Sequence, residues 1–344
     1  MSRKRPTMAA EQAVVRCERG FSLIELMIAL AMFSIVSLAG FTVLSSGQQN
    51  SSMNDEVVKM QQNVRLALEL ISRDVRMAGF GNPTDPSVVP LTANGCSSII
   101  TPTNSSTGPD SVAIITVDQV IGRLTANAPG ASPTTLTLDS TTGLSNGDVI
   151  TLDGVFTTGV TVNSGTQLTF AAPSGSWPSA IQAPMAFNGA AGTGTQVVRL
   201  ACVKYSVDTT NRQLLRDGVA VVDGIEDLQL AYGVDADGDG KIDDLSGNGS
   251  IDCLDLVPNN LAHAVTNSVG CSGTPGITVS SPPATATPTT VRLVRISVVG
   301  KAGKSDPTYT ASSAVSVEDH NIASTAGYRR RVLTRTVSLR DLGL

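Results

Sequence analysis

The sequence is poor in the residues on which soluble enzymes usually depend. Aromatic residues make up 3% of its 344 positions, charged residues make up 15%, and the two histidines are His263 and His320. It contains no Ser–His–Asp arrangement, Cys-x-x-Cys pair, phosphate-binding loop or dinucleotide-binding fingerprint. Lone histidines seldom indicate chemistry, so both are interpreted as surface residues. The chain is therefore predicted not to be an enzyme.

Basic residues are scarce outside the first 20 positions. The formal net charge is −5, although those 20 positions carry five cationic side chains against two carboxylates. Seven aspartates lie between Asp235 and Asp255, beside a single lysine. The run Arg329-Arg330-Arg331 is too short to carry affinity alone and is interpreted as the solvated start of a strand. An acidic chain without a basic patch argues against nucleic acid as a partner.

Cysteine usage indicates an oxidising compartment. Cys17 lies in the basic leader, and the other four cysteines, Cys96, Cys202, Cys253 and Cys271, follow it. An even number of cysteines suggests two disulfides, for which three pairings are possible. Loop closure favours Cys253 with Cys271, which leaves Cys96 with Cys202. Reduced, buried cysteines are the alternative.

One long apolar run dominates the N-terminal part. Between Phe21 and Leu44 the only charged residue is Glu25. About 20 apolar residues suffice to span a bilayer, and a carboxylate within such a run is costly and usually functional. The small residue Gly20 precedes the run, so cleavage there would keep the helix in the mature protein. By the positive-inside rule the basic leader would be cytoplasmic and the C-terminal part periplasmic.

The helix is expected to continue beyond the membrane. From Val57 onward, apolar residues recur every three or four positions, as on one face of a helix. Gly47 allows a bend or local loss of helix, and Gly79 is predicted to end the helix. The predicted helix, residues 21–78, would be about 87 Å long. The apolar face consists of Val57, Met60, Val64, Leu68, Ile71, Val75 and Ala78.

The remainder of the chain reads as short strands separated by turns. Asn146-Gly147 and Asn163-Ser164-Gly165 are strong turn signals, and the pattern favours an antiparallel sheet or a small barrel. The predicted fold class is α+β, with the amphipathic half of the helix packed on a C-terminal β-rich domain. The expected strands cover residues 111–120, 136–139, 148–152, 155–162, 167–171, 196–206, 213–222, 225–232, 290–299 and 330–340.

The heptapeptide GFSLIEL, residues 20–26, resembles the prepilin cleavage and methylation motif of type IV pilins and type II secretion pseudopilins. The resemblance implies that a prepilin peptidase cuts between Gly20 and Phe21 and methylates the new amino group of Phe21. It also implies that Glu25 contacts the N-terminal amine of a neighbouring subunit during assembly. A plain signal anchor would have no need of Glu25 at that position.

Three further segments resemble PilW-type minor pilins: residues 71–80, 223–233 and 328–340. The implied protein is a minor type IV pilin of the complex that initiates pilus assembly and sits at the tip, with links to twitching motility and adhesion. Its implied partners are other minor and major pilins and the inner-membrane assembly platform. It would start in the inner membrane and end on the pilus at the cell surface.

The resemblance also implies a division of the chain. Residues 1–20 would form the leader, residues 21–80 the pilin helix with its transmembrane part at 21–44, and residues 81–344 the β-rich domain. A J-like minor pseudopilin of type II secretion is an alternative. A tip adhesin with residues 97–200 as a ligand-facing insert is another, and a membrane-anchored hydrolase has the least support.

Residues 235–255 contain two copies of a nine-residue unit typical of calcium loops. Oxygen side chains at positions 1, 3, 5 and 9 with glycine at 6 follow the spacing of an EF-hand loop, and Ca²⁺ would neutralise the packed carboxylates. Ser246 replaces the usual glutamate at position 12, and a solvated Asp/Gly-rich turn is the alternative. The first copy would use Asp235, Asp237, Asp239, Lys241 (carbonyl), Asp243 and Asp244. The second, weaker copy would use Asp244, Ser246, Asn248, Ser250, Asp252 and Asp255.

Overall fold

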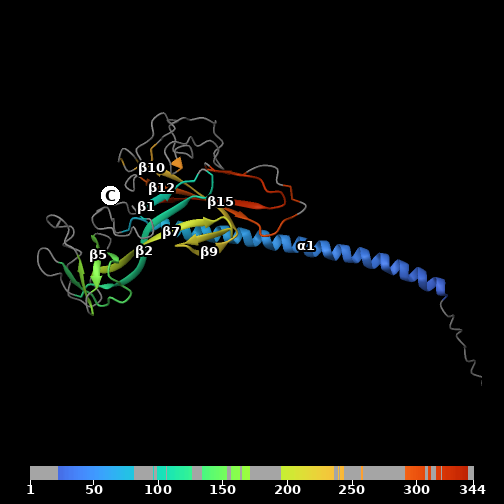
Figure 1. Cartoon of the computed structure of the whole chain (residues 1–344), viewed down its shortest axis with the longest axis horizontal. Helices are drawn as coiled ribbons and strands as arrows, with labels where there is room; N and C mark the ends of the chain where they lie inside the picture. Colours follow the sequence, from blue (N-terminus) through green and yellow to red (C-terminus); the bar gives the residue numbers. More distant parts are fainter. Residues whose placement is uncertain are drawn as a thin grey trace, which may run out of the picture. The chain divides into compact units, whose positions relative to one another are not determined.

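The computed structural model describes residues 22–80, 96, 99–105, 107–125, 134–152, 156–162, 165–170, 195–235, 239, 241–243, 257–258, 291–306, 309–310, 315–318 and 320–339. The fold is α+β, as the sequence predicts: one long helix, α1, is followed by antiparallel strands (Figure 1). The chain divides into two compact units, Met1–Asn54 and Asp55–Leu344, and this division falls inside α1.

Helix α1 runs from Leu23 to Arg76. It is unbroken across Gly47, where the sequence allowed a local loss of helix, because one glycine costs only about 1 kcal/mol within a long helix. The helix ends where predicted, in a turn in which Gly79 has a φ of 83°. Such left-handed glycines are common just after helix ends because they have no Cβ to clash.

The second half of α1 buries the apolar stripe that the sequence predicts. Arg73 and Arg76 lie in its last turn, where cations interact favourably with the helix dipole. Val57 is half-buried against the same core. The buried apolar residues of this stretch are Met60, Val64, Ala67, Leu68, Ile71, Val75 and Ala78.

Among the described residues, the larger sheet has nine strands, and part of it curls into a barrel. Its main path is β1 (Ile100–Thr103), β2 (Ser111–Arg123), β7 (Gln196–Asp208), β4 (Val149–Leu152), β5 (Phe156–Val162), β6 (Gln167–Phe170) and β3 (Thr135–Thr137). Strands β8 (Gln213–Arg216) and β9 (Val219–Asp223) extend it beyond β7.

A β-bridge between Leu124 and Leu138 returns β3 to the end of β2. The Thr125 N–H donates to the Thr137 carbonyl at 2.9 Å beside this bridge. Two register shifts in β2 let the strand bend out of the sheet and into the barrel. The small barrel that the sequence allowed is therefore present. Its separate core consists of Ile121, Leu124, Leu136, Leu138, Ile150, Leu152, Val160, Leu168, Phe170 and Val197.

In the described part of the chain, the second sheet has four strands in the order β11 (Val257–Pro258), β10 (Ile225–Val234), β12 (Val291–Lys301) and β15 (Arg330–Ser338). A short hairpin of β13 (Val315–Val317) and β14 (His320–Ile322) packs on it through a small apolar cluster. That cluster contains Val299, Val317 and Ile322.

One predicted strand is wrong. The sequence suggested a single strand over residues 213–222, but β8 and β9 form a hairpin there. Its two turn residues, Asp217 and Gly218, have φ values of 53° and 78°, as a type I′ turn requires. The dipeptide Asp217-Gly218 is itself a local signal for such a turn. The short strands β1, β11, β13 and β14 were not predicted, because two to four residues show too little alternation.

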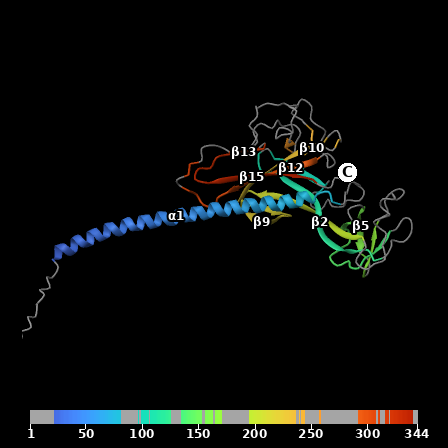
Figure 2. The ribbon, with the colours of Figure 1, turned by 180° about the vertical axis from the view of Figure 1, so that it is seen from behind.

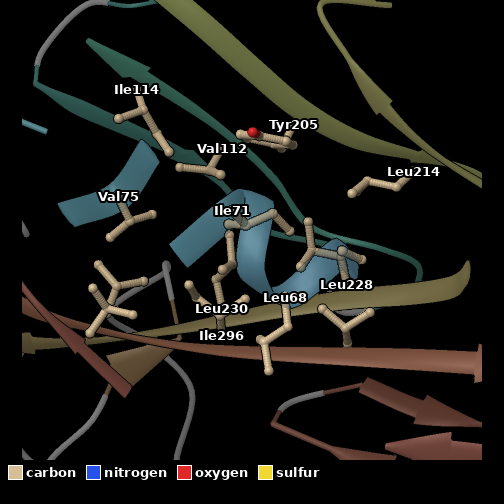
Figure 3. Packing of buried hydrophobic residues seen from close by; sticks show 14 of the residues in the cluster. Leu68, Ile71, Val75, Val112, Ile114, Tyr205, Leu214, Leu228, Leu230 and Ile296 are labelled. Carbon is tan, nitrogen blue, oxygen red and sulfur yellow. The ribbon is translucent and has the colours of Figure 1, made fainter. Parts of the chain in front are cut away.

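The main core lies where α1 meets both sheets. Leu68, Ile71 and Val75 of α1 face side chains of the larger sheet on one side and of β10 and β12 on the other (Figure 3). Asp110 links the sheets directly, because its backbone N–H donates to Leu228 and its carboxylate accepts from the Leu230 N–H, both at 2.8 Å.

Candidate functional site on the N-terminal helix

The first half of α1 exposes apolar side chains around its whole circumference. Leu23 is 76% exposed, and Phe33, Phe41 and Leu44 are exposed to a similar degree. The most apolar 18-residue window of α1 has a mean hydropathy of 2.3, so by length and composition the helix could cross a membrane. Water is a poor solvent for such a surface. Lipid or other apolar helices are the surroundings that it requires.

Two hydroxyl groups of this half donate to carbonyls of the same helix. Ser34 Oγ donates to the Leu30 carbonyl at 2.8 Å, and Thr42 Oγ1 donates to the Ala39 carbonyl at 2.7 Å. This back-bonding lets hydroxyl side chains exist in apolar surroundings. Glu25 differs, because within the described chain its carboxylate is exposed and makes no hydrogen bond or ion pair.

Glu25 lies in the first turn of α1, where a carboxylate interacts favourably with the helix dipole. The turn is closed by the Leu26 N–H, which donates to the Ser22 carbonyl at 3.1 Å. Gly20 and Phe21, the predicted cleavage and methylation positions, lie outside the described residues. A buried charged carboxylate without a partner is strongly unfavourable, so Glu25 must be neutralised, by a cation or by protonation, once its surroundings become apolar.

The predicted calcium loop begins at a fixed point. Asp235 follows β10 directly, its side chain is buried, and its Oδ2 accepts from Arg292 Nε and Nη2, both at 2.9 Å. Further along, Asp239 is exposed and accepts a hydrogen bond of 2.8 Å from the Lys241 N–H. Among the described residues, no group of three or more acidic, histidine or cysteine side chains is placed to hold a metal ion.

The rest of the acidic stretch is not described. Asp237 and Asp244 of the first copy lie outside the described residues. So do all ligands of the second copy, Asp244, Ser246, Asn248, Ser250, Asp252 and Asp255, as well as Cys253 and Cys271. Calcium binding therefore stays a prediction.

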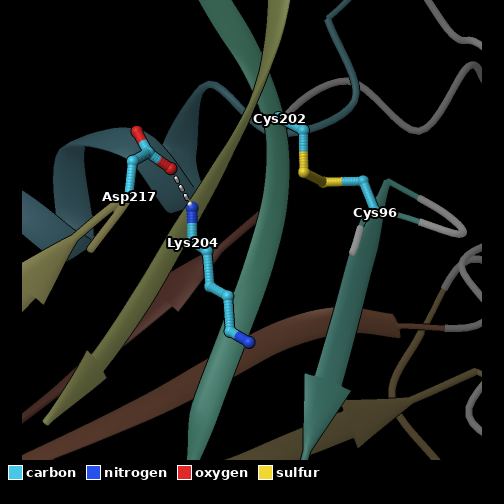
Figure 4. Close-up of a disulfide and its surroundings, with 4 residues drawn as sticks. All are labelled: Cys96, Cys202, Lys204 and Asp217. Atoms are coloured by element: carbon cyan, nitrogen blue, oxygen red, sulfur yellow. Dashed lines mark hydrogen bonds between the residues drawn. A yellow bond between two sulfur atoms is a disulfide. The ribbon is translucent and has the colours of Figure 1, made fainter. Parts of the chain in front are cut away.

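Cys96 and Cys202 form a disulfide, which is the pairing that the sequence favours for these two residues (Figure 4). Cys202 lies on β7, and Cys96 precedes β1. The disulfide joins the chain that follows α1 to the central strand of the larger sheet. Nearby, the Lys204 N–H donates to Asp217 Oδ1 at 2.8 Å and anchors the β8–β9 turn (Figure 4).

Two regions match known protein families. Residues 188–341 match the family described as type IV pilus-assembly protein W, PilW, and residues 15–41 match the prokaryotic N-terminal methylation motif. Over these residues the chain is similar to PilW-type members of the type IV pilin superfamily. Neither a curated protein nor a solved structure gives a significant match. Proteins of the PilW family are structural components of the pilus. The methylation motif agrees with membrane anchoring through α1.

The PilW-like segment at residues 71–80 has a structural role. Asp74 is buried at the end of α1 and accepts from the Tyr205 hydroxyl at 2.7 Å and from Arg216 Nη2 at 3.2 Å. Burial, followed by the hydrogen bond to Asp74, raises the pKa of Tyr205 well above its usual range, so Tyr205 stays a neutral donor. This contact fastens the end of the pilin helix to the larger sheet.

Two PilW-like segments that are far apart in sequence meet at Glu226 and Arg330. Glu226 accepts from Arg330 Nε at 2.5 Å and from Lys301 Nζ at 3.2 Å. Arg330 is therefore buried in an ion pair, and its interpretation as part of a solvated arginine run is wrong. The neighbouring Arg329 also pairs, with Asp306 at 2.8 Å. Carboxylates far away in sequence neutralise these cations, and the linear charge pattern could not show this.

The surface interpretation of His320 is also wrong. Its Nδ1 lies 2.7 Å from Asp227 Oδ2, and its side chain is only 15% exposed. Asp227 also accepts from Gln229 Nε2 at 3.0 Å. Burial raises the pKa of Asp227 despite these donors. The pair fixes the β13–β14 hairpin to β10 and is a structural contact, and His263 lies outside the described residues.

Proposed function

We propose that this PilW-type pilin is a minor pilin that joins other pilins in the complex that initiates pilus assembly and occupies the fibre tip. One observation carries the proposal: Glu25 is the single charged residue in the exposed, apolar first half of α1, between Leu23 and Leu44. A helix of this kind fits two surroundings in succession, first the inner membrane and then the core of a helical fibre.

The proposed mechanism uses the position of that carboxylate. A prepilin peptidase cuts between Gly20 and Phe21 and methylates Phe21, which leaves a cationic amine four residues before Glu25. In an apolar fibre core the amine of one subunit and the Glu25 carboxylate of a neighbour neutralise each other. Packing without this pair would leave two uncompensated charges, so the pair sets the register between subunits. The C-terminal domain would be carried on the periplasmic side and then outside the cell.

Replacing Glu25 with valine tests this mechanism. We expect the Glu25→Val protein to be processed to mature size and to remain in the membrane fraction, with at least a tenfold loss from sheared pili. Glu25→Gln keeps the size of the side chain and removes its charge, so it should fail in the same way, whereas the apolar exchange Met27→Leu should assemble normally. Immunoblots of membrane and pilus fractions give both readouts. Normal incorporation of Glu25→Val would refute the mechanism.

The cleavage assignment has its own test. Gly20→Leu places a large side chain at the scissile position and should leave the precursor uncut. A mature-size band from this variant would contradict the assignment. A J-like pseudopilin of type II secretion is the alternative within the superfamily. In that case Glu25→Val would abolish secretion and leave piliation unchanged.

The barrel favours an adhesin as the second candidate function. Strands β3–β6 precede residue 188, so they lie outside the PilW match and have a core of their own. The Leu124 N–H donates to the Thr195 carbonyl at 3.0 Å, so the two ends of this insertion already adjoin. Replacing residues 125–194 with an Asn-Gly turn removes most of the barrel. If piliation persists and surface adhesion is lost, the barrel is the binding module; unchanged adhesion excludes this role.

We also propose that residues 235–243 bind a structural calcium ion. The loop spacing supports this, and so does the fixed start of the loop at Asp235, which Arg292 holds. Asp239→Ala is the informative variant because Asp239 is exposed and its replacement leaves the Asp235–Arg292 pair intact. Calcium at about 100 times its dissociation constant should stabilise the wild type by about 2.7 kcal/mol.

Thermal unfolding in CaCl₂, MgCl₂ and EDTA measures this effect. Asp239→Ala should lose the calcium response, and Asp252→Ala tests the second copy in the same way. An unfolding temperature of the wild type that is equal in calcium and EDTA would contradict calcium binding.

A further inference from the structure

An open groove lies between the second half of α1 and strand β15, within the unit Asp55–Leu344. It has a volume of about 540 Å³ and is lined by both elements. Leu68 and Leu333 form its apolar part, together with Leu66, which is 49% exposed. Figure 2 shows α1 and β15 side by side from behind. The groove can therefore take an apolar side chain that approaches along the strand.

The outer hydrogen-bonding edge of β15 lies beside this groove. Strand β15 ends the four-stranded sheet, and none of the described strands pairs with its outer edge. One hydrogen bond lies at each end of its ladder with β12. The Ala302 N–H donates to the Arg329 carbonyl, and the Leu339 N–H donates to the Arg292 carbonyl, both at 2.9 Å. The register between them is continuous, so odd-numbered residues of β15 bond to β12. The groups that point outward include those of Val332, Thr334 and Thr336.

This edge is more suitable for strand pairing than the others. Nine residues of β15 pair with β12 without a bulge. In contrast, edge strand β9 is five residues long with a register shift against β8, and edge strand β1 contains Pro102. Bulges and proline are the usual devices that protect sheet edges from pairing. Strand β15 lacks both devices.

The positive charge around the groove indicates which charge a partner strand should carry. Arg65 lines the groove, and Arg331 lies two residues before Leu333 on the same face of β15. Neither arginine makes an ion pair or a hydrogen bond within the described chain. Arg335 is already paired with Glu69 at 2.5 Å, which lowers the pKa of Glu69. A second copy of β15 would bring more arginines and no carboxylate, so the charges favour an acidic partner.

We propose that β15 accepts an extended acidic strand from a partner subunit of the pilus, paired along the free edge of the sheet. One apolar side chain of that strand enters the groove beside Leu333, and flanking carboxylates pair with Arg65 and Arg331. Main-chain hydrogen bonds would supply affinity, and the groove and its arginines would supply specificity. The proposal rests on the proposed pilin function, since it assigns one surface through which such a subunit recognises its neighbour.

The test uses the full chain in detergent and two synthetic peptides. The acidic peptide acetyl-Thr-Glu-Thr-Leu-Thr-Glu-Thr-amide places one leucine between two glutamates on one face of a strand, and its counterpart has lysine in place of glutamate. We expect saturable binding of the acidic peptide by fluorescence anisotropy and at least tenfold weaker binding of the lysine peptide.

Matched variants locate the binding to the edge. Thr334→Pro removes an outward N–H, and Thr334→Val removes the same hydroxyl contact with Ser297 but keeps the N–H. Thr334→Pro should weaken acidic-peptide binding at least tenfold, Thr334→Val less than threefold, and Arg65→Gln about threefold to tenfold. If Thr334→Pro fails to fold by circular dichroism, Arg65→Gln with the two peptides decides.

Three outcomes would overturn the proposal. These are equal binding of both peptides, no saturable binding of either, or undiminished binding to folded Thr334→Pro. A concentration-dependent dimer that Thr334→Pro abolishes would assign the edge to a second copy and also refute an acidic partner. Peptide binding does not depend on fibre assembly, so its failure is distinguishable from failure of the Glu25→Val test.

Discussion

At the residue scale, the approach of α1 to the smaller sheet depends on a glycine. A Cβ built on Gly300 of β12 would lie 2.3 Å from Val64 Cγ2 and 3.1 Å from Met60 Cγ. Real side chains do not approach so closely, so the absence of a side chain at position 300 allows the helix to pack at this distance. Gly47 is the opposite case, because apart from the adjacent backbone of its own helix nothing lies within 4 Å of its Cβ position.

Gly300→Ala is expected to reduce the free energy of unfolding by about 1–3 kcal/mol through overpacking. Gly47→Ala should be neutral or stabilising by up to about 1 kcal/mol, because alanine is the better helix former. Urea unfolding followed by circular dichroism measures both. In the Val64→Ala background the Gly300→Ala substitution should cost less, and equal costs in the two backgrounds would refute the steric explanation.

At the element scale, one carboxylate fastens β15 to the start of β10. Burial alone would raise the pKa of Glu226, but the hydrogen bonds and charges of Arg330 and Lys301 outweigh burial and lower it from 4.5. A lowered carboxyl pKa means that this group stabilises the fold above pH 4.5. That contribution is lost as the pH falls through the lower pKa of the folded state.

Glu226→Gln should therefore cost about 2 kcal/mol at pH 7 and progressively less below pH 4.5. The raised pKa of Asp227 changes stability in the opposite direction with pH. Asp227 is present in both proteins, so the difference in stability between wild type and variant isolates Glu226. Urea unfolding between pH 7 and pH 3 measures this difference. Glu69→Gln, which changes an exposed ion pair, should show little effect. A Glu226 difference independent of pH would contradict this assignment.

At the scale of the whole molecule, barrel strands β3–β6 are an insertion in sequence between β2 and β7, two strands that pair with each other. The disulfide closes a loop of 106 residues that contains β1 to β6. Closing a loop of this length restricts the unfolded chain strongly. The covalent link therefore counteracts the entropy that a long insertion adds to the unfolded state.

Loss of this disulfide should lower the free energy of unfolding by about 3–5 kcal/mol. The measurement is the shift in unfolding midpoint of the wild type on reduction. The double variant Cys96→Ser, Cys202→Ser should start at the lower stability, and its further shift on reduction reports any other disulfide. A double variant as stable as the oxidised wild type would refute the assignment.

Local signals in the sequence determined the elements. Apolar spacing specified the buried stripe of α1, Gly79 specified its end, and alternation specified most long strands, because each signal acts over a few residues. The position of Glu25 after a glycine and within an apolar run is the basis of the proposed assembly site. The Asp217-Gly218 turn was equally local and could have been found.

Tertiary structure alone decided how distant charges are paired. Arg330 looked solvated and His320 looked exposed, because their partners Glu226 and Asp227 lie about 100 positions away in sequence. The closure of the barrel through Leu124 and Leu138 and the free edge of β15 are likewise consequences of strand order. Local patterns specify strands, but strand order depends on contacts between residues far apart in sequence, which no local pattern contains.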